Sequence, residues 1–255
     1  MRGNLKLSAA DWCFLKGGQD AATYYAKIKE LGYDAVEMPA PENYAAIKKL
    51  GMKILNAETL GSEQGGLSKL NRHAELIPAI ENIIRKAGDS GVRDVIVFSG
   101  NREGQTDVQG RKNVQIALER LLPLAEARKV TLVFEMFCAP NHPDYQADYS
   151  DYGFKLARSI NSSRVKVLYD IYHMHRMGED VIADVTGNLD IIAHLHIAGA
   201  PKRDYPGKNQ EINYAKIVPA IIKAGYQGYW GMEFMPTGDS VEELAQAAAQ
   251  WESLA

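Results

Sequence analysis

Cysteine is scarce in this sequence, and long apolar runs are missing from it. Cys13 and Cys138 are its two cysteines, too few for a disulfide framework or for a structural zinc site built from thiolates. No segment approaches the ~18 consecutive apolar residues of a membrane helix, and the N-terminus lacks the apolar core of a signal peptide. We therefore expect a cytoplasmic protein with no membrane partner.

A large excess of one charge sign is lacking as well. The chain of 255 residues has 29 Lys and Arg against 32 Asp and Glu, a formal net charge of -3. A protein that grips a phosphate backbone needs a basic surplus, so no nucleic-acid partner is expected. With 46% hydrophobic and 24% charged residues, the composition is that of an ordinary soluble globular protein.

What the sequence does contain is a regular alternation of two kinds of segment. Short β-branched and apolar runs are followed by longer segments whose apolar residues recur every three or four positions, and the pair repeats eight times. The expected strands are residues 5–12, 35–39, 53–58, 94–99, 131–137, 165–172, 193–198 and 229–235. The expected helices are residues 20–31, 42–50, 69–90, 107–129, 149–159, 178–188, 214–224 and 240–252. This pattern is typical of repeated βα units with parallel strands.

Glycines mark the ends of several expected helices. Gly32, Gly51 and Gly225 each follow an apolar-periodic segment, where a left-handed residue closes the last turn. Eight βα units of about 30 residues account for the chain as one closed (β/α)8 TIM barrel of the α/β class, a single domain over residues 1–255. A doubly wound open sheet is the main alternative, but no Gly-x-Gly-x-x-Gly turn follows the first strand to favour a dinucleotide fold.

Four consecutive strands have an acidic or imidazole side chain near their carboxyl ends. They are Glu135, Asp170, His196 and Glu233. Inward side chains at one height of a barrel converge, and their charges repel unless a cation compensates. Three carboxylates and one imidazole form a hard, mostly oxygen site, which suits Mn²⁺, Mg²⁺ or Co²⁺ and also accommodates Zn²⁺. An acid at a strand end, taken alone, is more often a helix cap or a salt-bridge partner than a ligand, and it is the set of four that favours a metal site.

Other polar side chains are expected on the same face of the barrel. His173 comes three residues after Asp170, where an imidazole is placed to hydrogen-bond a substrate oxygen. Arg203 offers a planar fork for a carboxylate or phosphate. His142 lies in the loop after Glu135 and is a further candidate substrate contact. A capping His173 and a solvated Arg203 are the alternatives.

Several further residues are expected around the rim. Glu58 ends the third strand and is a candidate substrate contact, while Glu37 and the pair Asn101 and Arg102 end the second and fourth strands. For these residues, hydrogen bonding or capping at the rim is the favoured interpretation. His73 reaches a substrate if the glycine-rich segment 61–68 folds over the mouth as a lid.

Three residues with ring side chains lie near the ends of predicted strands, and each is interpreted differently. Trp12, at the end of the first strand, is expected to form an apolar wall. His194 and His196 are two positions apart and so share a strand face. His196 is nearer the carboxyl end and is taken as the metal ligand, whereas His194 is assigned no role.

Several phrases of the sequence resemble a known enzyme family. LYDIYHMH, HLHIAGAPKR, QEINY and GYWGMEFMP, with FEMF before a proline-containing loop, resemble the hydroxypyruvate isomerase branch of the xylose isomerase-like TIM barrels. The resemblance implies a divalent-metal site made by Glu135, Asp170, His196 and Glu233. It also implies that Glu135 and Glu233 act as the catalytic acid and base, and that His173 and Arg203 contact a small-molecule substrate.

The resemblance implies an isomerase that interconverts hydroxypyruvate and tartronate semialdehyde through an enediolate. Two departures bear on the substrate: His196 stands where some hydroxypyruvate isomerases have glutamine and ketose 3-epimerases have histidine, whereas Asn141 and His142 stand where the epimerases place an extra glutamate. A ketose 3-epimerase is the nearest alternative, and a non-catalytic sugar-binding barrel is a more distant one. An endonuclease of the same superfamily needs a multi-zinc site and a basic face, which six histidines and a net charge of -3 serve poorly. A homo-oligomer is expected from the resemblance only.

Overall fold

The computed structural model describes residues 5–62 and 66–255. The chain forms two units. Unit 1 comprises Met1–Leu55, Asp180–Leu189 and His194–Ala255, and unit 2 comprises Asn56–Glu179 and Asp190–Ala193. In both units strands alternate with helices along the chain, as the repeated βα pattern predicts.

The strands of unit 1 are all parallel and follow the order β3-β2-β1-β9-β8. They are β1 (Lys6–Ala10), β2 (Tyr33–Glu37), β3 (Lys53–Ile54), β8 (Ile192–Ile197) and β9 (Tyr229–Met232). The first two residues of β8 belong to unit 2. Because parallel strands run the same way, their carboxyl ends share one edge of the sheet. Glu37 and Glu233 lie at this edge.

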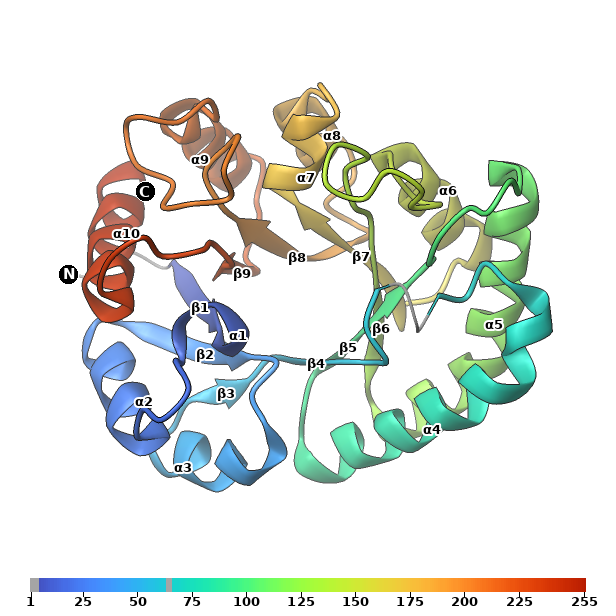
Figure 1. The fold of residues 1–255 in the computed structure, drawn as a ribbon, viewed down its shortest axis with the longest axis horizontal. Coiled ribbons are helices and arrows are strands. Elements are labelled where there is room, and N and C mark those ends of the chain that lie inside the picture. The colour runs from blue at the N-terminus through green and yellow to red at the C-terminus, as the bar shows by residue number, and fades with distance from the viewer. Residues whose placement is uncertain (1–4, 63–65) are drawn as a thin grey trace. The chain divides into compact units, whose positions relative to one another are not determined.

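Helices alternate with the strands of unit 1 along the chain. They are α1 (Asp11–Phe14), α2 (Ala21–Glu30), α3 (Tyr44–Lys49), α8 (Val181–Gly187), α9 (Tyr214–Lys223) and α10 (Ser240–Leu254), with a 3-10 turn η1 (Pro41–Asn43) before α3. In Figure 1, α2 and α3 lie on the same side of β1, β2 and β3. The apolar side of α2 is buried through Tyr24, Tyr25 and Ile28, which forms part of the core of this unit.

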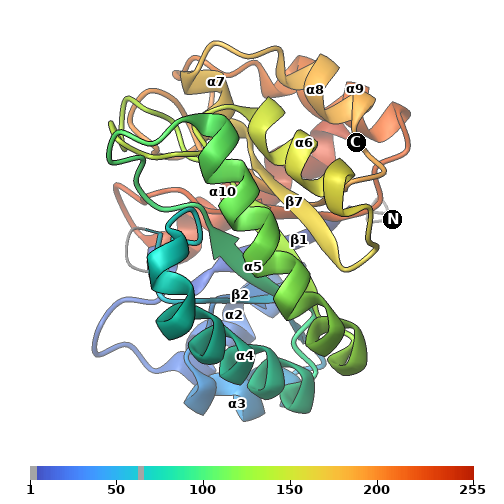
Figure 2. The same ribbon diagram turned by 90° about the vertical axis from the view of Figure 1, so that its right-hand side faces the viewer.

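Unit 2 repeats the same arrangement with parallel strands in the order β7-β6-β5-β4. The strands are β4 (Asn56–Glu58), β5 (Asp94–Phe98), β6 (Thr131–Glu135) and β7 (Val165–Asp170). The helices are α4 (His73–Ser90), α5 (Asp107–Arg128), α6 (Ser150–Ile160) and α7 (Ile171–Arg176), with a 3-10 turn η2 (Leu70–Arg72) before α4. Figures 1 and 2 both show α4 and α5 packed side by side. Every residue of β5 and β6 is buried, as expected for parallel strands covered on both faces.

The glycine stops are confirmed, whereas some strand ends differ from the prediction. Gly32, Gly51 and Gly225 have φ values of 99°, 69° and 101°, a backbone region that glycine enters without a Cβ clash. Residues 11 and 12, predicted as strand, belong to helix α1, and residues 171 and 172 belong to helix α7. In the second case Asp170 accepts a hydrogen bond from the His173 backbone N–H at 3.2 Å, so a helix cap replaces the apolar strand continuation.

The third predicted strand also differs, because residues 53–58 split into β3 and β4. Part of the predicted lid, residues 63–65 of segment 61–68, lies outside the described residues. Among the described helices, none combines the length and apolar character needed to cross a membrane.

Candidate active site

Glu233 follows β9 directly, and three groups hold its carboxylate. Trp12 Nε1 donates a hydrogen bond to Oε1 at 3.0 Å, and Arg203 Nη2 donates one to Oε2 at 2.5 Å. His196 Nδ1 lies 3.0 Å from the same Oε2. Burial raises the pKa of Glu233, but the positive charges of His196 and Arg203 outweigh it and lower the pKa to about 2. Glu233 is therefore ionised at neutral pH, the state that a metal ligand or a base requires.

Arg203 lies in the loop between β8 and α9 and is aimed at Glu233. The loop is closed by the backbone pair Gly199 and Asp204, and Met235 N–H donates to the Arg203 carbonyl oxygen at 2.7 Å. The guanidinium lies over the Trp12 ring, 5.6 Å from its centroid, a cation–π arrangement. Arg203 is thus a held side chain of the site rather than a solvated loop charge.

The opposite side of His196 contacts a second buried glutamate, Glu37. Glu37 Oε2 lies 3.0 Å from His196 Nε2 and 2.9 Å from His194 Nε2. Ser8 Oγ donates to Glu37 Oε1 at 2.6 Å, and ligand atoms of Glu37, His194 and His196 all lie within 4.8 Å of one another. Burial raises the pKa of Glu37, but the two histidines overcome this effect and hold the pKa well below its usual range.

The rim position expected for Glu37 was wrong, and His194, which the sequence left without a role, has a buried partner. Glu37 is fully buried and contacts His196, so it is not a rim residue. His194, assigned no role, is fully buried beside the same carboxylate. One available signal was the shared strand face of His194 and His196. A buried partner for that pair was to be expected, because buried imidazoles require hydrogen-bonding partners.

In unit 2, Glu135 and Asp170 end two neighbouring parallel strands, and both are buried. β6 and β7 pair in a register that places Glu135 beside Leu168. The Tyr145 hydroxyl donates to the Glu135 carbonyl oxygen at 3.1 Å, which fixes the end of β6. Asp170 caps α7 through its Oδ1 atom, so the alternative interpretation as a helix cap is confirmed for Asp170. This capping hydrogen bond uses Oδ1 and not the second carboxylate oxygen, Oδ2.

His173 is oriented by its neighbours in unit 2. The Cys138 backbone N–H donates to His173 Nδ1 at 3.2 Å, and Cys138 Sγ lies 3.2 Å from the same nitrogen. A neutral imidazole that accepts at Nδ1 carries its proton on Nε2, and His173 Nε2 lies 3.6 Å from Asp170 Oδ2. The His142 ring lies near those of His173 and Phe137, with centroids 5.8 and 4.7 Å away. Asp170, His173 and His142 are therefore brought together.

His73 and Glu58 differ in burial, since His73 is buried and Glu58 is exposed. His73 begins α4 and is buried, and its Nε2 lies 2.8 Å from the Leu67 carbonyl oxygen. It thereby holds the described end of segment 61–68. Glu58 ends β4 and is exposed. Arg102 pairs with Asp148 at 3.2 Å, which makes it a structural residue.

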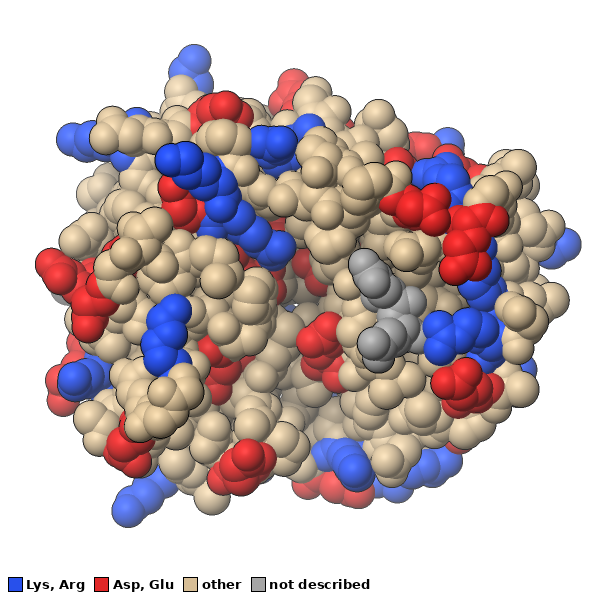
Figure 3. Space-filling model, viewed as in Figure 1, with Lys and Arg blue, Asp and Glu red and all other residues tan. Residues whose placement is uncertain are grey.

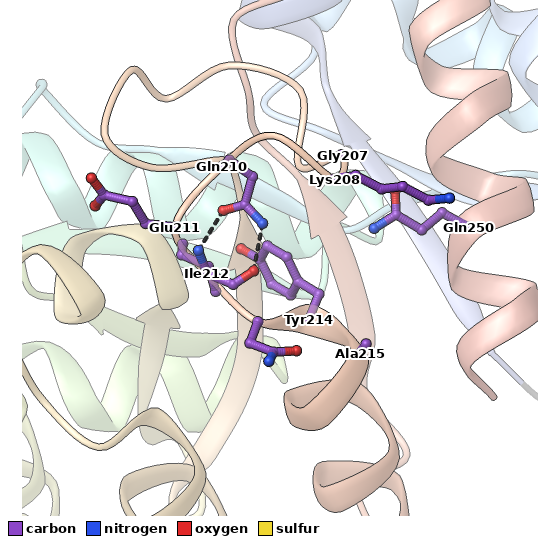
Figure 4. Close-up of a pocket in the computed structure, with 9 residues that line it drawn as sticks. Gly207, Lys208, Gln210, Glu211, Ile212, Tyr214, Ala215 and Gln250 are labelled. Carbon is purple, nitrogen blue, oxygen red and sulfur yellow. Dashed lines mark hydrogen bonds between the residues drawn. The ribbon is translucent and has the colours of Figure 1, made fainter.

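A separate cavity of about 350 Å³ lies in unit 1 between the β8–α9 loop, the start of α9 and Gln250 of α10. Figure 4 shows that Gln210 bonds within the loop to Ile212, whose N–H donates to Gln210 Oε1 at 2.6 Å. Gln250 Nε2 donates to the Pro206 carbonyl oxygen at 2.8 Å. These polar groups anchor the loop that holds Arg203, and none of the predicted site residues lines the cavity.

Basic and acidic side chains are interspersed on the face of the molecule drawn in Figure 3. This mixture agrees with the net charge of -3. A continuous basic surface of the kind that binds nucleic acid is not seen among the described residues of this face.

The sequence profile of the family named xylose isomerase-like TIM barrel matches residues 25–253. The chain belongs to this family. The predicted α/β fold class, a TIM barrel, is thereby confirmed, and the doubly wound alternative is excluded. The predicted extent of one domain over residues 1–255 stays a prediction.

Curated relatives of this xylose isomerase-like protein are isomerases. Hydroxypyruvate isomerase of Escherichia coli K12 is 25% identical over 255 residues, which cover 95% of this chain and 96% of the relative. 2-Oxo-tetronate isomerase of Cupriavidus necator is 26% identical, over 80% of this chain and 83% of the relative. The predicted class, an isomerase similar to hydroxypyruvate isomerase, is confirmed.

Solved structures share the fold of this xylose isomerase-like chain. A family 2 AP endonuclease from Brucella melitensis superposes with a TM-score of 0.86 at 19% identity, covering 98% of this chain and 99% of its own. The IOLI protein, described with a zinc atom, superposes with a TM-score of 0.76 at 17% identity, covering 97% of this chain and 96% of its own. At these identities the likeness shows the fold alone.

Proposed function

We propose that this chain is a divalent-metal-dependent isomerase that interconverts hydroxypyruvate and tartronate semialdehyde by proton transfer between neighbouring carbons. The observation that carries the proposal is the environment of Glu233. An ionised, buried carboxylate stands next to an imidazole and an arginine at the carboxyl end of a strand. In TIM barrels this is the end at which active sites are built.

The proposed metal ligands are Glu135, Asp170, His196 and Glu233. His196 and Glu233 are adjacent within unit 1, and Glu135 and Asp170 are buried carboxylates at neighbouring strand ends within unit 2. Buried carboxylates need compensating positive charge, so this donor set fits a divalent cation. Its oxygen-rich chemistry suits Mn²⁺, Mg²⁺ or Co²⁺ and also Zn²⁺. The zinc atom bound by the IOLI protein is in keeping with that choice.

The chemistry that a bound divalent cation supplies here is stabilisation of the negative charge that develops when a proton leaves the carbon next to a carbonyl. Glu135 and Glu233 are the proposed acid and base. One removes the proton from the hydroxymethyl carbon of hydroxypyruvate, and the other returns a proton to the neighbouring carbon. The low pKa of Glu233 keeps it deprotonated at neutral pH.

Arg203 and His173 are the proposed principal substrate contacts. Arg203 already binds one carboxylate, that of Glu233, and its fork is suited to the carboxylate of a short 2-oxo acid. His173 presents Nε2–H because its Nδ1 accepts from Cys138, so it is able to donate to a substrate oxygen. We further propose His142, Glu58 and His73 as outer substrate contacts.

A substrate panel tests the proposal. The chain is stripped of metal, reconstituted with Mn²⁺, Mg²⁺, Co²⁺ or Zn²⁺, and assayed with hydroxypyruvate, 2-oxo-tetronate and neutral ketoses. We expect turnover that depends on metal and is greatest for a short 2-oxo acid. Turnover restricted to neutral ketoses would favour the 3-epimerase, and turnover unaffected by chelation would contradict the metal site. Cytoplasmic location and homo-oligomerisation stay predictions.

A further inference from the structure

The buried carboxylate of Glu37 contacts three side chains within unit 1, and their geometry limits which atoms carry protons. Oε1 accepts from the Ser8 hydroxyl at 2.6 Å. Oε2 faces His194 Nε2 at 2.9 Å and His196 Nε2 at 3.0 Å. An ionised carboxylate has only acceptor atoms, so both imidazoles must present N–H groups from their Nε2 atoms.

Donation from Nε2 determines what the other nitrogen of His196 is able to do. In a neutral imidazole only one nitrogen carries a proton, and the other offers a lone pair. His196 Nδ1 faces Glu233, 3.0 Å from Oε2. A bare lone pair there would be repelled by the Glu233 carboxylate, so in the metal-free chain Nδ1 also carries a proton, and loss of that proton makes its lone pair available to a divalent cation.

We propose that Glu37 is a positioning residue that keeps the His196 proton on Nε2 and thereby makes Nδ1 the ligand atom for the divalent cation. This inference rests on the proposed metal site. It goes beyond that site because it selects one nitrogen of His196 and assigns the selection to a residue that does not bind the metal. A carboxylate that accepts from the far nitrogen of a ligating histidine fixes its tautomer and raises its basicity.

His194 and Gly231 restrict the position of the Glu37 carboxylate. The rings of His194 and His196 are nearly perpendicular, with an interplanar angle of 88° and centroids 4.9 Å apart, so they approach Oε2 from two directions. On the Oε1 side, a Cβ at Gly231 would lie 2.3 Å from that oxygen and 2.7 Å from His194 Nε2. The missing side chain of Gly231 thus leaves the space that the carboxylate occupies.

Calorimetric titration with Mn²⁺ and Zn²⁺ tests the inference on the full chain. We expect one ion per chain in the unsubstituted protein and about 10–100-fold weaker binding in Glu37→Gln, which keeps the shape of the side chain but removes its charge. The matched control is Glu243→Gln, a buried carboxylate whose Oε1 accepts from Thr237 and Gly238. Its metal affinity should equal that of the unsubstituted chain.

Gly231→Ala provides a second route that leaves every proposed ligand in place. The new methyl group must displace the Glu37 carboxylate, so metal affinity should fall as it does in Glu37→Gln. Circular dichroism checks that each variant folds. If neither variant folds, the nitrogen assignment below still decides the question on the unsubstituted chain.

Nitrogen-15 NMR of histidine-labelled protein loaded with Zn²⁺ reads the tautomer directly. We expect His196, assigned by His196→Asn, to show a protonated Nε2 and a metal-bound Nδ1. The opposite pattern would overturn the inference, as would unchanged affinity in Glu37→Gln or a second bound ion that occupies Glu37, His194 and His196. No metal binding at all in the unsubstituted chain would overturn the proposed metal site itself, and the inference with it.

Discussion

Glu37 and Glu233 are two glutamates of unit 1 that contact the same imidazole from opposite sides, yet they are held in different ways. Glu37 receives hydrogen bonds from Ser8 and two histidines, all of them buried on strands. Glu233 is held by His196 and also by Trp12 and Arg203, which lie outside the strands. Both have lowered pKa values.

Glu37 and Glu233 differ in whether a bound ligand is able to displace their hydrogen-bonding partners. The partners of Glu37 are buried on strands, so strand geometry and tight packing fix their positions. We therefore assign Glu37 a structural role. The Trp12 side chain is 50% exposed, and Arg203 lies on a loop, so both are accessible to exchange with a bound molecule. We therefore propose that Glu37 fixes the ligand geometry at this edge of the sheet and that Glu233 is available for chemistry.

The most severe test of this comparison is Glu233→Gln. The substitution removes the charge that we assign to metal binding and proton transfer but keeps the volume of the side chain. We expect turnover of hydroxypyruvate to fall by about 10²–10⁴-fold or more, with the circular dichroism spectrum unchanged. Glu135→Gln should behave alike. Full activity in either variant would remove that residue from the chemistry.

Arg203→Ala should have the next largest effect, and the effect should depend on the substrate. A charge-assisted hydrogen bond is worth about 1.5–3 kcal/mol, so kcat/KM for hydroxypyruvate should fall by about 10–100-fold relative to kcat/KM for a neutral ketose. For each substrate, kcat/KM of the variant is divided by kcat/KM of the unsubstituted chain. Comparing these two ratios corrects for any change in Glu233 that affects both reactions. An equal loss for both substrates would show that Arg203 acts through Glu233 alone.

Trp12→Phe should have a smaller effect. It removes the indole N–H that donates to Glu233 Oε1 and keeps an aromatic ring beneath the Arg203 guanidinium. Because Trp12 is half exposed, water replaces part of the lost hydrogen bond, and we expect kcat to fall by about 3–10-fold. A loss as large as that in Glu233→Gln would mean that Trp12 contacts the reacting atoms.

A third buried carboxylate, Asp11, sharpens the comparison because its pKa moves in the opposite direction. Burial raises the pKa of Asp11 to about 7, against the lowering effect of the hydrogen bond from the Tyr25 hydroxyl. The folded chain therefore binds a proton that the unfolded chain releases near pH 4. Folding stability associated with Asp11 is present below pH 4 and is lost as the pH rises to 7.

Asp11→Asn removes this loss, since the amide has no charge to desolvate. Relative to the unsubstituted chain, the variant should gain stability between pH 5 and pH 8, with a rise in melting temperature of about 2–4 °C for each kcal/mol gained. Melting curves at the two pH values provide the measurement. A difference in melting temperature that stays constant with pH would contradict the raised pKa.

The periodic features of the fold could be predicted from the sequence, and several contacts of the site could not. Gly32, Gly51 and Gly225 predicted helix ends because a positive φ is a local property. Local periodicity did not predict the end of β7, because the capping hydrogen bond from His173 N–H to Asp170 competes with the strand. Ile171 and Tyr172 are apolar, and apolar residues fit a buried strand and a buried helix equally well.

The role of Glu37 depends on contacts far apart in the chain. Its partner His196 is 159 residues away, and neither the spacing nor the composition around Glu37 distinguishes a rim residue from a buried acceptor. Trp12 likewise contacts Glu233 across 221 residues. Such pairs follow from strand order and register, which become definite only in the folded sheet.

Deuterium wash-in tests the central claim, proton transfer next to a carbonyl, most directly. The metal-loaded chain is incubated with hydroxypyruvate in D₂O, and deuterium at the hydroxymethyl carbon is followed by NMR against a protein-free control. We predict enrichment above the control that disappears on chelation and in Glu233→Gln. No enrichment above the control with Mn²⁺, Mg²⁺, Co²⁺ or Zn²⁺ would contradict the proposed reaction.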